Sequence, residues 1–195
     1  FNSSIDTVIE SNVFDNMMMC TEDYGAIYTW SGNAYRSNVV RYNMIKNITD
    51  GARYGIYFDG CDGNIAYGNI LYDAGLTNVV LNGGRDNDFH DNVLIFPDGG
   101  SYRTVNDYVY FSETDEERIE HGSSGKSNIE SVIPKEGAPG YELWKARWPE
   151  MYAFSYDLAD YGKTECYLTT VNYFSRNAVI GGSAAADKSV FPFLV

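Results

Sequence analysis

Apolar residues recur along this chain in short runs that are separated by Gly, Asn and Asp. Five of these runs share a motif in which an Asn is followed by two apolar residues, and the motif begins at Asn12, Asn43, Asn69, Asn92 and Asn177. The first four asparagines are spaced by 31, 26 and 23 residues. No strong helical period appears before residue 140, so the pattern predicts short β-strands rather than helices.

A second apolar patch follows each of the first three motifs, at residues 25–28, 55–58 and 78–81. Repeats of this length suit coils that wind round and stack on one another, with neighbouring coils about 4.8 Å apart. Matched asparagines tolerate left-handed turn geometry, and their stacked amides can bond from coil to coil. We therefore expect an all-β fold, a right-handed parallel β-helix. The alternative is an antiparallel sandwich with Asn-rich turns.

The pattern stops at about Phe96 and resumes near Val171. We predict β-helix coils over residues 1–96, a long and partly helical insertion over 97–170 packed on them, and a resumed coil over 171–195. The short helix is expected within 139–152 and is broken at Pro149. Insertions in repeat proteins often form the binding face. The apolar final residues indicate further coils of the same polypeptide, within a larger β-helix domain, or a partner.

Charge and cysteine content exclude several classes of partner. The chain carries 27 acidic and 14 basic side chains, a net charge of -13, which argues against binding nucleic acid or an anionic membrane surface. No apolar run reaches the roughly 18–20 residues of a membrane span. The three cysteines have no CxxC spacing, so we expect small buried thiols and no zinc site; one disulfide bond stays an alternative.

Several Asp residues flank the second apolar patches and are candidates for chemistry: Asp23, Asp59, Asp62 and Asp86. Hydrolysis of a glycosidic bond uses two carboxyl groups, although Asp beside Gly is also ordinary turn chemistry. If the patches stack, Asp23 and Asp59 lie at opposite ends of their strands, roughly 20 Å apart. Asp59 and Asp86 both follow their strands and form a better neighbouring pair. We expect no cofactor; a structural calcium ion stays an alternative.

The motifs Asp23-Tyr-Gly-Ala-Ile-Tyr28, Gly55-Ile-Tyr-Phe-Asp59 and Gly83-Gly-Arg-Asp86, in this order, resemble secreted bacterial parallel β-helix proteins, particularly glycoside hydrolase family 141. That family has fucosidase and xylanase members. The resemblance runs over residues 5–96. The chain departs from relatives at Gly60, where they often have a second Asp, and at residues 31–33, where they often have Arg-Asp-Trp.

The resemblance implies a glycoside hydrolase that is secreted, periplasmic or on the bacterial cell surface and acts on a carbohydrate. It implies that Asp23 and Asp59 are the catalytic pair. The candidates for substrate contact are Trp30, Tyr28, Tyr57, Asp62, Arg85 and Asp86. The same aromatic side chains also fit ordinary packing on strands.

Two alternative functions stay open at this point. One is a polysaccharide lyase, which needs a basic group and a means of neutralising a uronate; the 14 basic residues form no cluster and argue against it. The other is a non-catalytic carbohydrate-binding or surface β-helix protein, in which the acidic residues only form turns.

Overall fold

The computed structural model describes residues 4–17, 20–32, 35–48, 53–75, 77–82, 86–97, 103–108, 131–153 and 172–181. These residues are mostly β-structure. The strands are β1 (Val8–Glu10), β2 (Val13–Asp15), β3 (Tyr24–Gly32), β4 (Val39–Arg41), β5 (Met44–Ile48), β6 (Arg53–Cys61), β7 (Ile65–Tyr67), β8 (Ile70–Ala74), β9 (Thr77–Asn82), β10 (Asp88–His90), β11 (Val93–Ile95), β12 (Arg103–Tyr108), β13 (Tyr173–Ser175) and β14 (Ala178–Ile180). The described helices are α2 (Tyr141–Arg147) and α3 (Glu150–Ala153).

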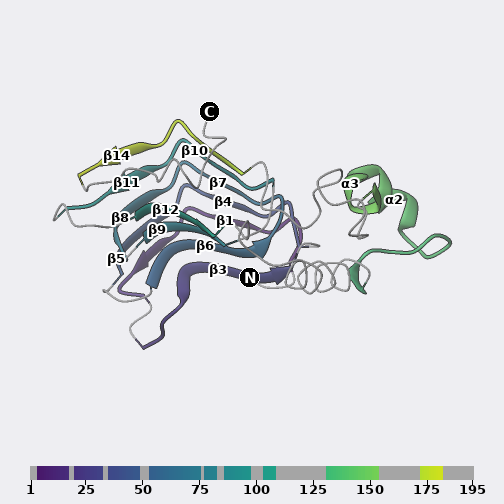
Figure 1. The fold of residues 1–195 in the computed structure, drawn as a ribbon, viewed down its shortest axis with the longest axis horizontal. Helices are drawn as coiled ribbons and strands as arrows, with labels where there is room; N and C mark the ends of the chain where they lie inside the picture. Colours follow the sequence, from purple (N-terminus) through teal and green to yellow (C-terminus); the bar gives the residue numbers. More distant parts are fainter. Residues whose placement is uncertain are drawn as a thin grey trace.

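The strands form three sheets, and every strand pair among the described residues is parallel. Sheet A has the order β1-β4-β7-β10-β13, sheet B has β2-β5-β8-β11-β14, and sheet C has β3-β6-β9-β12. The chain visits sheets A, B and C in turn, and we call one such visit a circuit. Figure 1 shows the circuits stacked in layers. Parallel pairing rules out the antiparallel sandwich for these strands.

A ladder of asparagine side chains joins the circuits between sheets A and B. The ladder consists of Asn12, Asn43, Asn69, Asn92 and Asn177, the five asparagines that the sequence motif aligns. Each Nδ2 donates to the Oδ1 of the next asparagine at 2.9–3.1 Å. Each backbone N–H donates to the same oxygen, which satisfies buried polar groups at the turn. The predicted stacking of these amides is confirmed.

The left-handed turn residue is the one before each ladder asparagine, rather than the asparagine itself. Ser11, Tyr42, Gly68, Asp91 and Arg176 all have φ between 53° and 65°. This corrects the expectation that asparagine would adopt the left-handed conformation. The asparagine is held instead by its side chain, and the strained position before it accepts several residue types because the surrounding ladder fixes the backbone.

The main core consists of the inward-facing residues of all three sheets. Its fully buried members include Val40 and Phe89 from sheet A, Leu71 from sheet B and Phe58 from sheet C. The chain packs closely at Gly55, where a Cβ atom would lie 2.6 Å from the backbone oxygen of Asn78 in β9 and 2.7 Å from Cδ2 of Leu71 in sheet B. Glycine is therefore required at the start of the Gly-Ile-Tyr motif by packing.

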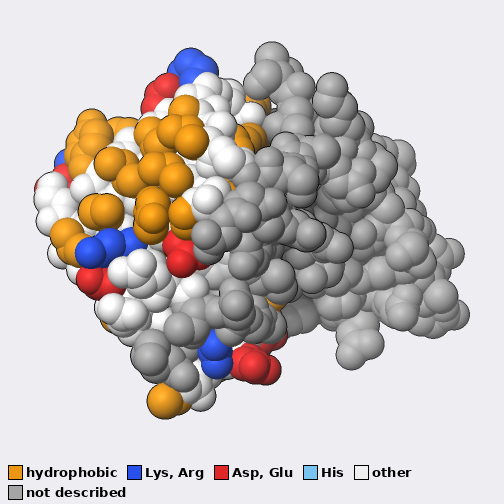
Figure 2. Space-filling view, turned by 90° about the vertical axis from the view of Figure 1, so that its left-hand side faces the viewer, with side chains coloured by type: hydrophobic (Ala, Val, Ile, Leu, Met, Phe, Trp, Pro, Cys, Tyr) orange, Lys and Arg blue, Asp and Glu red, His pale blue; other side chains and the backbone are white. Residues whose placement is uncertain are grey.

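The outer faces of sheets A and B differ in character. On sheet A, Arg41 binds Glu10 and Tyr67, and the Tyr67 ring stacks on His90. The outer face of sheet B carries exposed apolar side chains, including Val13, Ile70 and Ile180. Figure 2 shows such apolar side chains gathered on the side of the molecule where sheet B lies.

The range predicted as an insertion, 97–170, contains both sheet and helix. Strand β12 lies in this range and pairs with β9, so sheet C extends beyond Phe96. Helices α2 and α3 form a separate small cluster, far from most of the strands in Figure 1. Trp148 Nε1 donates to Ser37 Oγ at 2.9 Å and Arg147 pairs with Asp6, which anchors this segment beside sheet A. Among the described residues, no helix could span a membrane.

Candidate functional site

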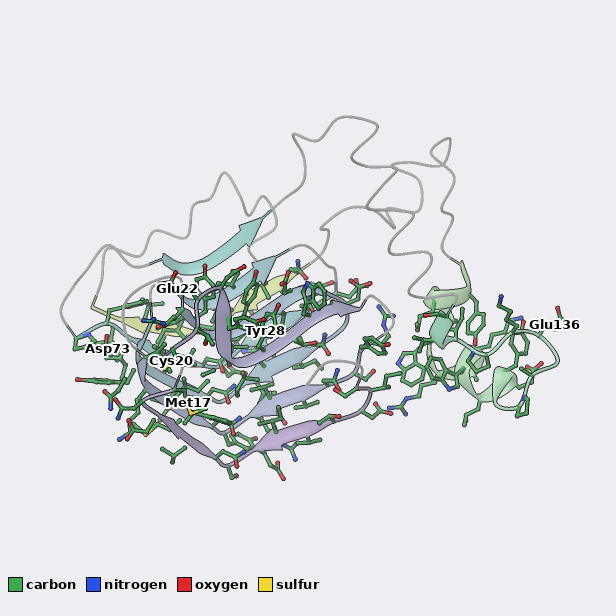
Figure 3. The ribbon with its side chains drawn as sticks, turned by 90° about the horizontal axis from the view of Figure 1, so that it is seen from below. Met17, Cys20, Glu22, Tyr28, Asp73 and Glu136 are labelled. Atoms are coloured by element: carbon green, nitrogen blue, oxygen red, sulfur yellow. The ribbon has the colours of Figure 1, made fainter. Side chains whose placement is uncertain are left out.

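The outer face of sheet C brings together four of the predicted site residues. The register of β3 and β6 places Tyr28 opposite Tyr57 and Trp30 opposite Asp59. Because alternate strand positions point to the same face, all four side chains lie on one surface, away from inward-facing Ile27. Figure 3 shows Tyr28 on the β3 ribbon in this part of the molecule.

A hydrogen bond links a phenol and a carboxylate of this surface. The Tyr28 hydroxyl donates to Asp59 Oδ2 at 2.9 Å. Burial, and then this hydrogen bond, raise the pKa of the Tyr28 phenol well above its ordinary value. Tyr28 therefore stays protonated near neutral pH and acts as a fixed donor to the carboxylate. The bond between circuits fixes the orientation of Asp59.

Aromatic rings surround this pair. The Tyr28 ring contacts Tyr24 and Tyr57 at centroid distances of 4.9 and 5.1 Å, and Tyr57 contacts Tyr54 at 5.1 Å. Tyr54 and Tyr57 are buried with Val80, in a cluster separate from the main core. Tyr57 therefore lies beside Tyr28 on the same face but is covered, with 3% of its surface exposed. The sequence analysis did not identify Tyr24 and Tyr54. A sequence signal for them exists, because each directly precedes the glycine that opens its apolar patch, Gly25 or Gly55.

Trp30 and Tyr24, at 56% and 47% exposure, are the large aromatic side chains that the described part of this surface presents to solvent. Trp30 lies directly across from Asp59. An exposed indole beside an oriented carboxylate is an arrangement that can hold a planar or ring-shaped ligand against a reactive group. The expectation that Trp30 contacts a ligand stays a prediction.

The sheet does not bring Asp23 close to Asp59. Asp23 precedes the Tyr24–Arg53 pair and is exposed, whereas Asp59 lies opposite Trp30 at the other end of the strands. Seven strand residues at about 3.3 Å each separate the two positions by about 23 Å. Asp23 has a φ of 58°, so it makes a left-handed turn at the entrance to β3.

Asp62 lies in the interior. It is 1% exposed and pairs with the buried Arg36 at 3.8 Å. Opening this ion pair would leave both buried charges without compensation, which disfavours its rearrangement. The contact of Asp62 with a substrate stays a prediction.

Asp86 occupies a turn position. It has a φ of 58° and precedes Asn87 as Gly63 precedes Asn64, and these two asparagines belong to a second hydrogen-bonded ladder. Asp86 is half-buried and follows β9, the strand next to β6. Arg85 lies outside the described residues.

No cluster of three or more His, Cys, Asp or Glu side chains suited to a metal ion occurs among the described residues. Cys20 is exposed and Cys61 is buried, and both are free thiols. Burial raises the pKa of the Cys61 thiol well above its ordinary value, so Cys61 is an unreactive core residue.

Comparison with known proteins gives no assignment: no protein family model, curated protein or solved structure matches this chain.

Proposed function

We propose that this chain is part of a right-handed parallel β-helix that cleaves glycosidic bonds on the outer face of sheet C. The cyclic visits to three parallel sheets support the β-helix, since stacked circuits of this order are its connectivity. The observation that carries the function is the Tyr28–Asp59 hydrogen bond beside the exposed Trp30. The resemblance of the motifs to glycoside hydrolase family 141 agrees with this proposal.

In the proposed reaction, the Trp30 ring stacks on a sugar. Asp59 is one of two carboxyl groups, of which one protonates the leaving oxygen and the other activates water or attacks the anomeric carbon. A hydrolase needs a second carboxyl group about 5 Å away for retention, or about 6.5–9.5 Å away for inversion. Asp86 is the nearer candidate along the chain path, because it stands four residues after Asn82, the β9 residue that pairs with Asp59, whereas Asp23 lies at the far end of β3. The hydroxyl of Tyr28 keeps Asp59 oriented in both cases.

The test is a screen of the chain and its Asp59→Asn, Asp86→Asn and Asp23→Asn variants against a panel of glycans. Cleavage is measured as new reducing ends and as ultraviolet absorbance from an unsaturated sugar. We expect Asp59→Asn to lower the rate of hydrolysis by about 10²–10⁴-fold, the range for removing an acid or base. Asp91→Asn, a neutralised carboxylate on the turn beside sheet A, is the matched control and should retain activity.

Two outcomes would contradict the proposal. Full activity in the Asp59→Asn variant would remove Asp59 from the reaction. Glycan binding without cleavage by the unmodified chain would favour the non-catalytic carbohydrate-binding alternative. A larger loss in Asp23→Asn than in Asp86→Asn would restore Asp23 as the second carboxyl group, despite its place at the other end of β3.

A polysaccharide lyase is the second candidate, and one observation favours it. The Tyr28 phenol stays protonated beside a carboxylate, on a surface with an exposed indole, and a protonated tyrosine can serve as the general acid that gives a proton to the leaving oxygen. Ultraviolet absorbance that appears with the unmodified chain and disappears in Tyr28→Phe would identify this reaction instead of hydrolysis.

A further inference from the structure

An exposed tyrosine occupies a backbone position where a bulky side chain is strained. Tyr42 lies at the turn between sheets A and B, directly before Asn43 of the ladder, and has a φ of 56°. This left-handed conformation is unfavourable for large side chains. None of the other described turns before a ladder asparagine holds an aromatic residue, so the turn itself does not need one. Strained residues of this kind are concentrated at functional sites.

The next circuit is shaped to receive the Tyr42 ring. A Cβ atom at Gly68 would lie 2.7 Å from both Cδ1 and Cε1 of Tyr42 but 3.9 Å from its Cγ. One edge of the ring therefore rests on the bare backbone of Gly68, and the side chain is 57% exposed. Tyr42 belongs to the second circuit, and described circuits lie on both sides of it. Its exposure on an outer surface therefore does not depend on where the stack ends.

Polar groups surround this ring. The Arg41 guanidinium lies over it, 5.8 Å from the ring centroid, and the Tyr67 ring is nearly perpendicular to it at 5.4 Å. Arg41 binds Glu10 through Nε and Nη2 at 2.6 Å, and its Nη1 donates to the Tyr67 hydroxyl at 3.0 Å. A guanidinium has more N–H donors, and a carboxylate more acceptor sites, than these bonds use. Both groups are partly exposed, so spare donors and acceptors lie beside the ring.

A fixed aromatic ring with spare donors and acceptors beside it suits a sugar. A sugar ring has an apolar face of C–H groups that can stack on an aromatic ring, and hydroxyl groups around it that both donate and accept. Other partners suit this surface less well. The net charge of -13 disfavours a phosphate backbone. A protein partner needs a wider apolar centre than a single tyrosine provides.

We propose that the edge between sheets A and B is a carbohydrate-binding site built around Tyr42. A sugar ring stacks on Tyr42, Arg41 donates to its hydroxyl groups, and Glu10 accepts from them. The three sheets enclose one core, so this edge and the outer face of sheet C are different surfaces of the molecule. The site therefore binds a glycan whether or not sheet C cleaves one.

The experiment is isothermal titration with three neutral hexasaccharides as probes: cellohexaose, xylohexaose and mannohexaose. Every sample carries Asp59→Asn, so that binding is measured with little cleavage. We expect Tyr42→Ala to weaken binding at this site by about tenfold or more, the effect of losing one aromatic contact, and Tyr42→Phe to preserve binding because it keeps the ring. The matched control is Tyr72→Ala, which removes an exposed tyrosine from sheet B and should leave the affinity unchanged.

Two further variants make the test specific. Gly68→Ala keeps every side chain of the site but places a methyl group against the ring edge, so it should also weaken binding. Trp30→Ala separates this site from sheet C. Binding that is lost in Tyr42→Ala and kept in Trp30→Ala supports the site between sheets A and B and counts against sheet C. Binding that is lost in Trp30→Ala and kept in Tyr42→Ala does the reverse.

Two results would overturn the site between sheets A and B. One is that none of the three probes binds. The other is that Tyr42→Ala binds every probe as tightly as Tyr72→Ala does. Far-ultraviolet circular dichroism and the thermal midpoint of Tyr42→Ala and Gly68→Ala show whether each variant keeps its fold. If Gly68→Ala unfolds, the comparison of Tyr42→Ala with Tyr42→Phe decides the question alone.

Discussion

The asparagine ladder and the outer face of sheet C lie on the same succession of circuits but follow opposite rules. In the ladder, Asn43, Asn69 and Asn92 are buried and make the same bonds in every circuit. On the outer face of sheet C, the matched positions of β3 and β6 hold Trp30 and Asp59, which share no chemistry. Repetition thus indicates positions that hold the circuits together, and loss of repetition indicates positions that are free to take on function.

The ladder and the outer face of sheet C differ because the surroundings of their side chains differ. A buried amide must be satisfied by the circuits on both sides, so every circuit needs the same group there. A side chain on an outer face has no such requirement. The hydrogen bond from Tyr28 to Asp59 is therefore a feature of two particular circuits, and the repeat does not explain it.

The largest predicted effect is on stability, at the middle of the ladder. Asn69 accepts from Asn43 and donates to Asn92 and to the carbonyl of Val40. Asn69→Ala leaves several of these buried groups unpaired at about 1–3 kcal/mol each, so we expect a loss of at least about 3 kcal/mol. Asn12→Ala, at the exposed end of the same ladder, should cost about 1 kcal/mol or less. Urea unfolding of both variants measures the difference, and equal losses would contradict the assigned role of burial.

An intermediate effect is predicted on activity, at sheet C. Tyr28→Phe removes one hydrogen bond to a carboxylate, worth about 1.5–3 kcal/mol, so glycan cleavage should fall by about tenfold or more. The free energy of unfolding should change by less than it does in Asn69→Ala. The control is Tyr72→Phe, which alters an exposed tyrosine on sheet B. Kinetics on a glycan that the chain cleaves give the result, and equal activity in both variants would remove Tyr28 from the site.

The smallest effect is predicted on the turn beside sheet A, where side chains pair in solvent. Hydrogen bonds from Arg176 and then His90 hold the pKa of Asp91 well below its ordinary value. A lowered pKa adds stability above the unfolded value of about 3.9, and this contribution is lost as the pH falls through the folded value. Asp91→Asn should therefore make the stability less dependent on pH below about 4. Urea midpoints measured over this range test the prediction. An unchanged pH dependence would contradict it. High salt should reduce the difference between the unmodified chain and Asp91→Asn, because salt screens exposed charges.

The sequence predicted the repeated strand–Asn–strand units and about half of the candidate surface on sheet C. The spacing of Asn12, Asn43, Asn69, Asn92 and Asn177 identified the ladder, because each circuit must place an amide at the same point. The sequence did not show that β12 continues sheet C, since Arg103–Tyr108 lacks the Asn motif. The resemblance supplied Tyr28, Trp30, Tyr57 and Asp59 as candidates, and the observed pairing of β3 with β6 then put them on one face of sheet C.

The sequence by itself determined which positions repeat, and so predicted strands joined through asparagine; the structure decided that these strands pair in parallel and not as an antiparallel sandwich. Only the tertiary structure decided the partners of the charged residues. The loops between circuits differ in length, and the register across them sets which side chains meet. That register sent Asp62 into the interior to pair with Arg36, left Asp23 at the far end of β3, and placed the Tyr28 hydroxyl against Asp59. Local pattern specifies a repeat, whereas a contact between circuits depends on where each loop returns the chain.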